Sequence, residues 1–239
     1  SSSWSRGRGA AAVLRAGVDP QASFVLAADP VTLVAGRDDV AVASRADDLA
    51  ALEANALVDA LNAHFAHDGL AFVAPRPDTW FATLAARPAL ATAPLDAALG
   101  ARLSAFPLSG RDARTWMRWG TEIQMLLYQH PVNRRRETQG RALANGVWFW
   151  GGGALADVGL CAPFRAHAPE GRAGDLVRGL AQHAGGEALR LPGSFEAAID
   201  AAPATRPASH VAALLPPIAD AASLAALESA WLGPALEWL

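Results

Sequence analysis

Hydrophobic and polar positions alternate in short runs in the first part of the chain. Residues 24–34 read FVLAADPVTLV, a segment rich in β-branched and apolar side chains that is typical of a strand. Residues 40–43 predict a second strand, and residues 70–74 and 80–84 predict two more around a Pro-Arg-Pro-Asp turn. Short strands joined by tight turns indicate an α+β unit with an antiparallel sheet.

Helical periodicity appears twice in the same part of the chain. Leucine, alanine and phenylalanine recur every three or four positions over residues 49–65. Ser44 followed by Asp47 resembles a capping box, so we expect this helix to begin near Ser44. A second helix is expected at residues 111–129, with Trp116, Trp119, Ile123, Leu126 and Leu127 on one face. Residues 89–110 predict a short helix and otherwise loop.

Strands and helices alternate in the second part. A short buried strand is predicted at residues 147–150, before three glycines. A helix at residues 175–184 precedes a strand at 188–191, and a strand at 211–215 precedes a helix that begins near residue 223. This alternation predicts a parallel, doubly wound sheet.

Composition narrows the classes of function. Hydrophobic residues make up 52% of the 239 residues and charged residues 18%, which is typical of a globular protein. Neither a membrane-spanning run nor a signal-peptide pattern is found, and the single cysteine, Cys161, favours a reducing, cytoplasmic compartment. A net charge of -3 gives no electrostatic attraction to nucleic acid. All 20 basic residues are arginine, which excludes chemistry that needs a lysine.

Four motifs lie along the chain in order. The first is Gly7-Arg8-Gly9 followed by Ala16-Gly17-Val18, and the third is the segment WFWGGG at residues 148–153. The second runs without a gap through His130-Pro131-Val132-Asn133, Arg136, Gly140 and Ala144-Asn145. The fourth combines Leu176-Val177-Arg178-Gly179 with Gly185 and Pro192-Gly193. In residues and spacing, these motifs resemble the archaeal-type cofactor-independent phosphoglycerate mutases, and among bacterial proteins the RpfE-type regulatory proteins look most similar.

The resemblance implies an α/β fold of alkaline-phosphatase type, with a doubly wound sheet and an inserted α+β domain. Residues 22–135 would form the insert. Residues 1–21 and 136–239 would be parts of the phosphatase-like domain. The change in periodicity along the chain falls near the same place.

The family's reaction needs a serine nucleophile and two divalent metal ions such as Mn²⁺, held by aspartate and histidine. The nucleophile is expected before Gly7, in a region that the chain does not contain. The family's second metal-ligand stretch corresponds to residues 214–223, where Asp220 is the one carboxylate. One carboxylate cannot hold a metal pair. We therefore identify no catalytic residue, no metal ligand and no cofactor.

Further departures concern substrate binding. The arginine of the insert's first hairpin is replaced by Ala27 or Ala28, and the family's His-Asp pair reads Leu95-Asp96. The residues that remain as substrate-binding candidates are Arg8, His130, Asn133, Arg136, Asn145, Gly151, Gly152 and Gly153.

Two interpretations of these residues stay open. In one they form a residual pocket for a small phosphorylated or anionic ligand, with Arg136 as the clamp and glycine amides as donors. In the other they are structural: His130 and Asn133 cap helix ends or fasten the chain, Arg136 pairs with Glu122 or Glu137, and the glycines meet backbone requirements. The lone histidines His167 and His183 are expected at the surface.

Three functions follow. The first is a divergent, non-catalytic mutase-like protein with a binding or regulatory role. The second is an active metal-dependent phosphomutase, an isomerase that interconverts 2-phosphoglycerate and 3-phosphoglycerate, or a phosphatase. The third is a protein-interaction module, which an exposed apolar patch around Trp231 or Trp238 would favour. No membrane or nucleic acid is expected as a partner.

Overall fold

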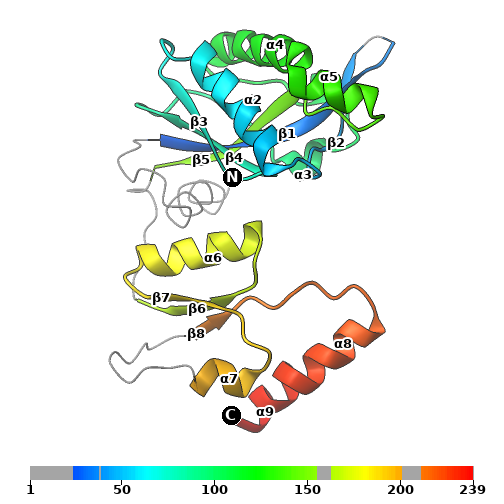
Figure 1. Ribbon diagram of the computed structural model, residues 1–239. Coiled ribbons are helices and arrows are strands. Elements are labelled where there is room, and N and C mark those ends of the chain that lie inside the picture. Colours follow the sequence, from blue (N-terminus) through cyan, green and yellow to red (C-terminus); the bar gives the residue numbers. More distant parts are fainter. Residues whose placement is uncertain (1–23, 38, 155–162, 201–210, 239) are drawn as a thin grey trace. The chain divides into compact units, whose positions relative to one another are not determined.

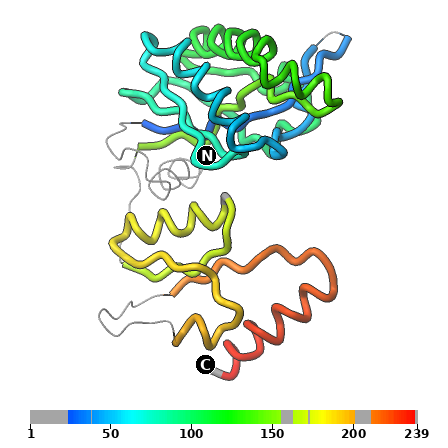
Figure 2. Tube along the Cα trace, viewed as in Figure 1, coloured from blue at the N-terminus to red at the C-terminus, as the bar shows by residue number. Residues whose placement is uncertain are grey.

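The computed structural model describes residues 24–37, 39–154, 163–200 and 211–238 (Figure 1). The chain divides into two compact units: one holds the described residues up to 154, and the other holds those from 163 onward. Figure 2 traces the course of the chain through each unit. The first unit includes residues 136–154, whereas the assignment to an insert and a phosphatase-like domain has its boundary at residue 136. That assignment stays a prediction.

The first unit is built on a five-stranded antiparallel sheet, as expected. Its centre is β1, which pairs with β2 and β4 on one side and with β5 on the other, while β3 extends the sheet beyond β4. The strands are β1 (Phe24–Ala35), β2 (Val40–Arg45), β3 (Leu70–Arg76), β4 (Thr79–Leu84) and β5 (Gly146–Gly153).

The prediction that residues 147–150 join the parallel sheet is wrong. β5 runs antiparallel to β1, with Gly146 opposite Val31 and Gly153 opposite Val25. A short apolar strand has the same sequence pattern in either kind of sheet, so its direction depends on the chain that leads into it.

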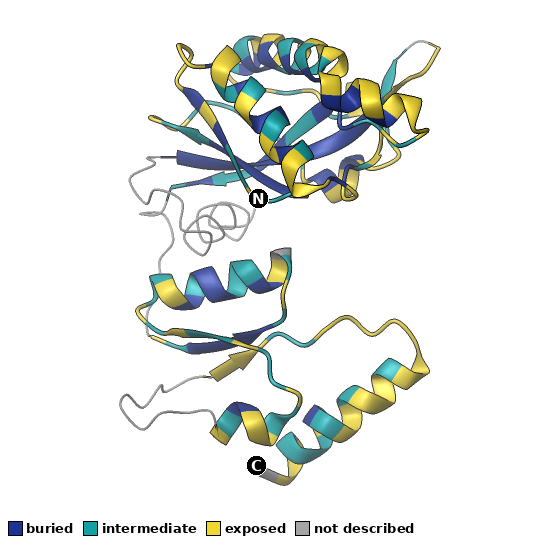
Figure 3. Ribbon diagram, viewed as in Figure 1, coloured by how far each residue is buried: buried dark blue, intermediate teal, exposed yellow. Residues whose placement is uncertain are grey.

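Two hydrophobic clusters lie on opposite faces of this sheet, because successive side chains of a strand point to opposite faces. One cluster packs under α2 (Ala51–His64) and α4 (Ala113–Gln129) and includes Phe149. The other includes Trp150 and packs against α3 (Leu95–Ala98) and the 3-10 helix η1 (Leu103–Ala105). The buried surfaces of α2 and α4 turn toward the sheet, and their outer surfaces are exposed (Figure 3). α5 (Pro131–Thr138) links α4 to the segment before β5.

Helix α2 begins later than expected. Ser44 is part of β2 and pairs with Thr32, so the predicted capping box at Ser44 and Asp47 is wrong. The helix starts at Ala51, and the Glu53 carboxylate accepts a hydrogen bond from the Ala50 amide at 3.0 Å. Pairing with β1 keeps Ser44 extended, which overrides the local signal for a cap.

The second unit contains the predicted parallel sheet. Its order is β7-β6-β8, from β6 (Arg165–Ala168), β7 (Glu187–Arg190) and β8 (Val211–Ala213). The flanking strands are added on either side of β6, as in a doubly wound sheet. α6 (Arg172–His183) connects β6 to β7 and packs against both (Figure 1). The remaining helices are α7 (Phe195–Asp200), α8 (Ala221–Leu227), the π-helical turn η3 (Glu228–Leu232) and α9 (Gly233–Trp238).

Within the described ranges, none of the helices has the length and apolar character that crossing a bilayer requires.

Candidate functional site

The HPVN motif forms the junction between α4 and α5. His130 is the N-cap of α5, where its Nδ1 accepts a hydrogen bond from the Val132 amide at 3.2 Å, and Pro131 occupies the first turn. Burial, followed by the positive charge of Arg135, lowers the pKa of His130. The lowered pKa favours the neutral ring, and the bond from the Val132 amide requires the tautomer in which Nδ1 accepts, so the expected capping role of His130 is confirmed.

Asn133 fastens the end of α4 to the segment before β5. Its side-chain amide donates to the carbonyls of Leu127 and Ala144 at 2.8 and 2.9 Å, and its Oδ1 accepts from the Ala144 amide at 2.9 Å. The side chain is buried. A buried amide with these three bonds serves the fold, because each bond satisfies a backbone group that would otherwise lack a partner.

Asn145 repeats this arrangement at the sheet. Its Oδ1 accepts from the Leu33 amide at 2.7 Å and its Nδ2 donates to the Leu33 carbonyl at 2.9 Å. Nearby, the Thr32 hydroxyl donates to the Leu143 carbonyl at 2.8 Å. The segment that precedes β5 is therefore tied to β1 just beyond the last pair of the two strands, Val31 and Gly146.

Arg136 lies completely buried between α5 and the start of α2. Its Nε donates to the Ala142 carbonyl at 2.7 Å, one terminal nitrogen donates to Glu53 at 2.9 Å, and the other is bonded to Asp48. The partners are thus Asp48 and Glu53, and the suggested pairing with Glu122 or Glu137 is replaced by them. Two carboxylates compensate the charge of the buried guanidinium. Burial of that charge without a partner would be strongly unfavourable.

Arg141 completes this ion cluster from the solvent side. It contacts Glu53 at 3.4 Å and Asp48 at 3.2 Å, and it also donates to the Asp48 carbonyl at 2.7 Å. Burial of Asp48 acts to raise its pKa, but the hydrogen bonds and charges of Arg136 and Arg141 outweigh that effect, so the pKa is lowered. Asp48 therefore stays ionised, and together with Glu53 it holds both arginines.

The glycines at the end of β5 form a bulge against β1. Val25 faces Gly153 and Ala27 faces Trp150, so β5 has one more residue than β1 between these pairs. Gly151 has a φ of 61°, in the left-handed region. A Cβ on Gly152 would lie 2.7 Å from the Phe24 ring. Backbone geometry and close packing explain both glycines.

A second buried arginine, Arg178, lies in the LVRG motif of the second unit. One terminal nitrogen donates to the carbonyls of Ala168 and Pro169 at 2.7 and 2.8 Å, and the other donates to Asp175 at 2.7 Å. Gly174 allows this approach, since a Cβ there would lie 1.8 Å from the Pro169 carbonyl oxygen. Arg178 therefore holds the connection between β6 and α6.

The candidate residues fall into two groups in the structure. His130, Asn133, Arg136 and Asn145 lie along one connected segment from the start of α5 to the start of β5, whereas Gly151, Gly152 and Gly153 lie at the far end of β5. Arg8 lies outside the described residues.

Asp220, the one carboxylate in the stretch that corresponds to the family's second set of metal ligands, is the N-cap of α8. Its carboxylate accepts from the Ser223 amide at 2.8 Å, and hydrogen bonds from that amide and the Ser223 hydroxyl lower its pKa. No cluster of three or more metal-ligating side chains occurs in the ranges that the structure covers. The expectation that His167 lies at the surface is wrong: it is buried in β6.

Sequence patterns did not predict a pocket that lies beside β5. It lies between α4 and residues 92–108, has a volume of about 440 Å³, and is lined by Gly120 and Gln124 among others. A glycine in the middle of an amphipathic helix is the one local signal for it, because such a glycine weakens the helix unless space is required.

Comparisons with known proteins give a consistent relationship. No family model matches the chain. The 2,3-bisphosphoglycerate-independent phosphoglycerate mutase of Methanothrix thermoacetophila is 33% identical over 114 residues, which are 45% of this chain and 28% of that protein.

Two solved structures share the architecture. The cofactor-independent phosphoglycerate mutase of Thermoplasma acidophilum matches 88% of this chain and 60% of its own, with a TM-score of 0.50 and 17% identity. A protein from Pyrococcus horikoshii matches 87% of this chain and 51% of its own, with a TM-score of 0.50 and 16% identity. The chain thus spans less than two thirds of each of these proteins. It has the alkaline-phosphatase-like α/β fold of the cofactor-independent phosphoglycerate mutases and is a distant homologue of them.

Proposed function

We propose that this chain is a divergent phosphoglycerate-mutase-like protein that does not transfer phosphoryl groups and has a binding or regulatory role. The bonding of Arg136 carries the proposal. In a mutase, arginines bind the phosphate and carboxylate of the substrate. Here the guanidinium of Arg136 has no exposed surface and is bonded to two carboxylates and one carbonyl.

An anion at Arg136 would have to displace Asp48 and Glu53. Its approach would also bring a further negative charge beside the carboxylates that already pair with Arg136, which costs free energy at short range. The neighbouring motif residues Asn133 and Asn145 also have their side chains hydrogen-bonded to backbone groups of the protein. These contacts support a role for the motif in maintaining the fold.

The resemblance to RpfE-type proteins supports a regulatory role in the cytoplasm of a bacterium. The single cysteine fits a reducing compartment. The net charge of -3 supports a partner other than nucleic acid. Under this proposal the chain needs no cofactor, and its partner is a small ligand or another protein.

The first experiment measures metal content and phosphoryl transfer together. The purified chain is supplied with Mn²⁺ or Co²⁺, metal is quantified, and 3-phosphoglycerate and a generic phosphatase substrate are assayed. The Thermoplasma acidophilum mutase serves as the positive control. We expect no stoichiometric metal and no turnover, and bound metal with turnover would overturn the proposal.

An active phosphomutase or phosphatase is the alternative. The 33% identity to a named mutase supports it, and it would require a divalent metal pair such as Mn²⁺. The residual anion site at Arg136 is tested separately, by titrating 3-phosphoglycerate into the native chain and the Asp48→Asn variant. We expect neither to bind, whereas a clamp at Arg136 would bind more tightly once one competing carboxylate is removed.

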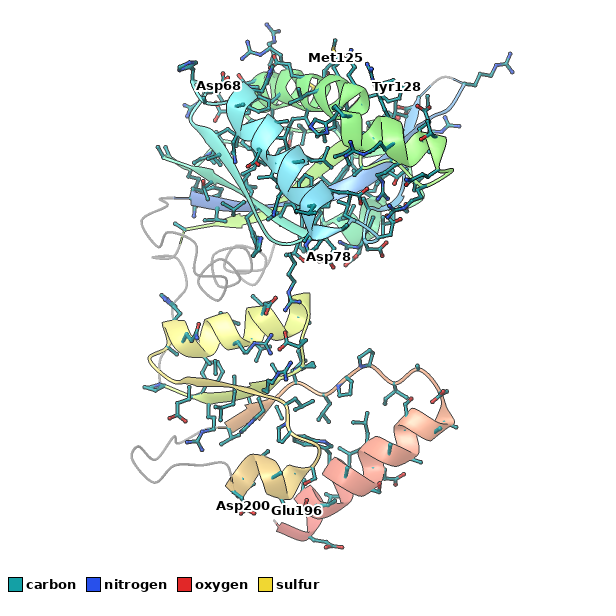
Figure 4. All side chains as sticks on the ribbon, in the orientation of Figure 1. Asp68, Asp78, Met125, Tyr128, Glu196 and Asp200 are labelled. Atoms are coloured by element: carbon teal, nitrogen blue, oxygen red, sulfur yellow. The ribbon has the colours of Figure 1, made fainter. Side chains whose placement is uncertain are left out.

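A protein-interaction role is supported by exposed apolar side chains beside Trp231, where Leu232 and Leu236 are 45% and 73% exposed. Trp231 itself is buried, and the side chain of Trp238 lies outside what the structure describes. Exposed apolar side chains also occur on α4, where Met125 and Tyr128 point outward (Figure 4).

A further inference from the structure

The pocket beside β5 has rigid aromatic walls. Trp116 and Phe149 line it from the face of the sheet that α4 covers, and Phe106 and Trp148 line it from the other side. The Trp148 indole donates to the Ala93 carbonyl at 2.9 Å, and the Phe106 ring packs edge-on against Trp148 with centroids 6.1 Å apart. These contacts fix the walls. The volume of about 440 Å³ falls in the range of about 300–1,000 Å³ that is common for small-molecule sites.

Neutral polar groups also line the pocket. Gln124 and Thr92 are among the residues that line it, and their side chains make no hydrogen bond to any residue that the structure describes. Unused amide and hydroxyl groups beside aromatic walls are the usual means of orienting a mainly apolar ligand.

Asp39 brings a negative charge to the pocket. A hydrogen bond from the Ser104 hydroxyl, followed by one from the Val40 amide, lowers the pKa of Asp39, and Arg102 is close enough to act in the same direction. Asp39 is therefore ionised at neutral pH. Since Asp39 is the one charged residue among the described residues that line the pocket, an anion there would meet a like charge.

Gly120 provides part of the space. It lies in the interior of α4, and a Cβ built on it would have no atom within 4 Å. Glycine at such a position costs roughly 0.5–1 kcal/mol relative to alanine. The helix therefore forgoes some stability at the position where a larger side chain would enter the pocket.

We propose that this pocket binds an uncharged, ring-bearing small molecule, which stacks on Trp148 and Phe106 and is oriented by Gln124 and Thr92. The site shares Trp148 and Phe149 with the third motif, but it includes none of the substrate-binding candidates that the structure describes, and it does not depend on whether the chain transfers phosphate. It also predicts a ligand of different chemistry from the phosphorylated compound that the resemblance implies.

The test uses two probes that differ in one group. N-phenyl-1-naphthylamine is neutral, and 8-anilino-1-naphthalenesulfonate has the same ring system with an added sulfonate. We expect the neutral probe to bind the native chain saturably with one site, and the sulfonate to bind at least tenfold more weakly. Equal or tighter binding of the sulfonate would contradict the assigned chemistry.

Two substitutions at Gly120 locate the binding. Gly120→Leu fills the pocket and is expected to weaken binding of the neutral probe at least tenfold, whereas Gly120→Ala keeps most of the space and is expected to bind like the native chain. Both variants are expected to unfold at the native temperature or above, because neither requires the backbone to move. Unchanged binding by Gly120→Leu would overturn the proposal.

Two further variants separate this pocket from general surface binding. Asp39→Asn removes the like charge and is expected to increase sulfonate binding without weakening that of the neutral probe. Tyr128→Ser changes the exposed apolar surface of α4, 57% exposed at Tyr128, and is expected to leave binding unchanged. A loss of neutral-probe binding in Tyr128→Ser, or no gain of sulfonate binding in Asp39→Asn, would contradict the proposal.

Discussion

The two units use a buried arginine of a family motif in different ways. Arg136 in the first unit and Arg178 in the second are both almost free of solvent contact, and both donate to backbone carbonyls. Arg136 also bonds to Glu53 and Asp48, which lie 83 and 88 positions away in the chain. The partners of Arg178, in contrast, lie within ten positions of it in the chain. One arginine therefore joins distant segments of the chain, and the other shapes a single connection.

We expect this difference to determine how much of the chain is destabilised when each arginine is substituted. Contacts between distant segments reduce the conformational freedom of a long stretch of chain, whereas local contacts restrict only one loop. The resemblance to phosphoglycerate mutases gives no sign of this, because a motif records residue types and spacing and not their partners. Four measurements test the contacts described for the two units.

The largest effect is expected for Arg136→Met. Removing the buried guanidinium leaves Glu53 and Asp48 without their main partner, so we expect a loss of about 3 kcal/mol in the free energy of unfolding. Arg141→Met is the matched control: it contacts the same two acids, but its side chain is 36% exposed, and about 0.5 kcal/mol or less is expected. Denaturant titration measures both. Equal losses would show that burial of Arg136 is not the cause.

The second measurement compares two helical glycines. Gly174→Ala places a Cβ 1.8 Å from the Pro169 carbonyl oxygen, so the β6–α6 connection must move, and a loss of about 2 kcal/mol is expected. Gly120→Ala meets nothing and is expected to gain about 0.5–1 kcal/mol. Hydrogen exchange should place the change for Gly174→Ala within residues 163–191. Changes of the same sign in both variants would contradict the contacts described.

A third, smaller effect is expected at the start of α8. Asp220→Asn retains an acceptor for the Ser223 amide and should leave the melting temperature nearly unchanged, whereas Asp220→Ala should lower it. Differential scanning calorimetry in a metal-free buffer distinguishes the two. If added Mn²⁺ stabilised the native chain and not Asp220→Asn, Asp220 would be a metal ligand and more than a cap.

The smallest effect is a pH dependence at His130. Its pKa is lowered in the folded state, so the unfolded chain binds this proton more readily. Stability from this residue is fully present above about pH 6.5, the ordinary value for histidine, and is lost as the pH falls toward the folded pKa. His130→Asn keeps the cap without titrating, so the difference in unfolding free energy between variant and native chain should change in this window. A constant difference would contradict the assignment.

Secondary structure was largely predictable from the sequence. The strand at 24–34, the helix at 111–129 and the parallel sheet of the second unit are confirmed, because each follows from local hydrophobic periodicity. The capping signal at Ser44 failed because pairing with Thr32 extends that segment. The predicted direction of β5 was wrong because an apolar strand fits either a parallel or an antiparallel sheet.

At the candidate site, the residues that stand out could be identified from the sequence. The residue types and spacing of HPVN, Arg136 and Asn145 were visible without a structure, and the resemblance that they indicated agrees with the comparisons. The contacts of these residues became known only from the packing of the folded chain. Segments far apart in the chain form each of these features: the bond from Arg136 to Asp48, the hydrogen bonds between Asn145 and Leu33, and the space beside Gly120. A local pattern does not specify such partners, because they are set by how the whole sheet and its helices pack together.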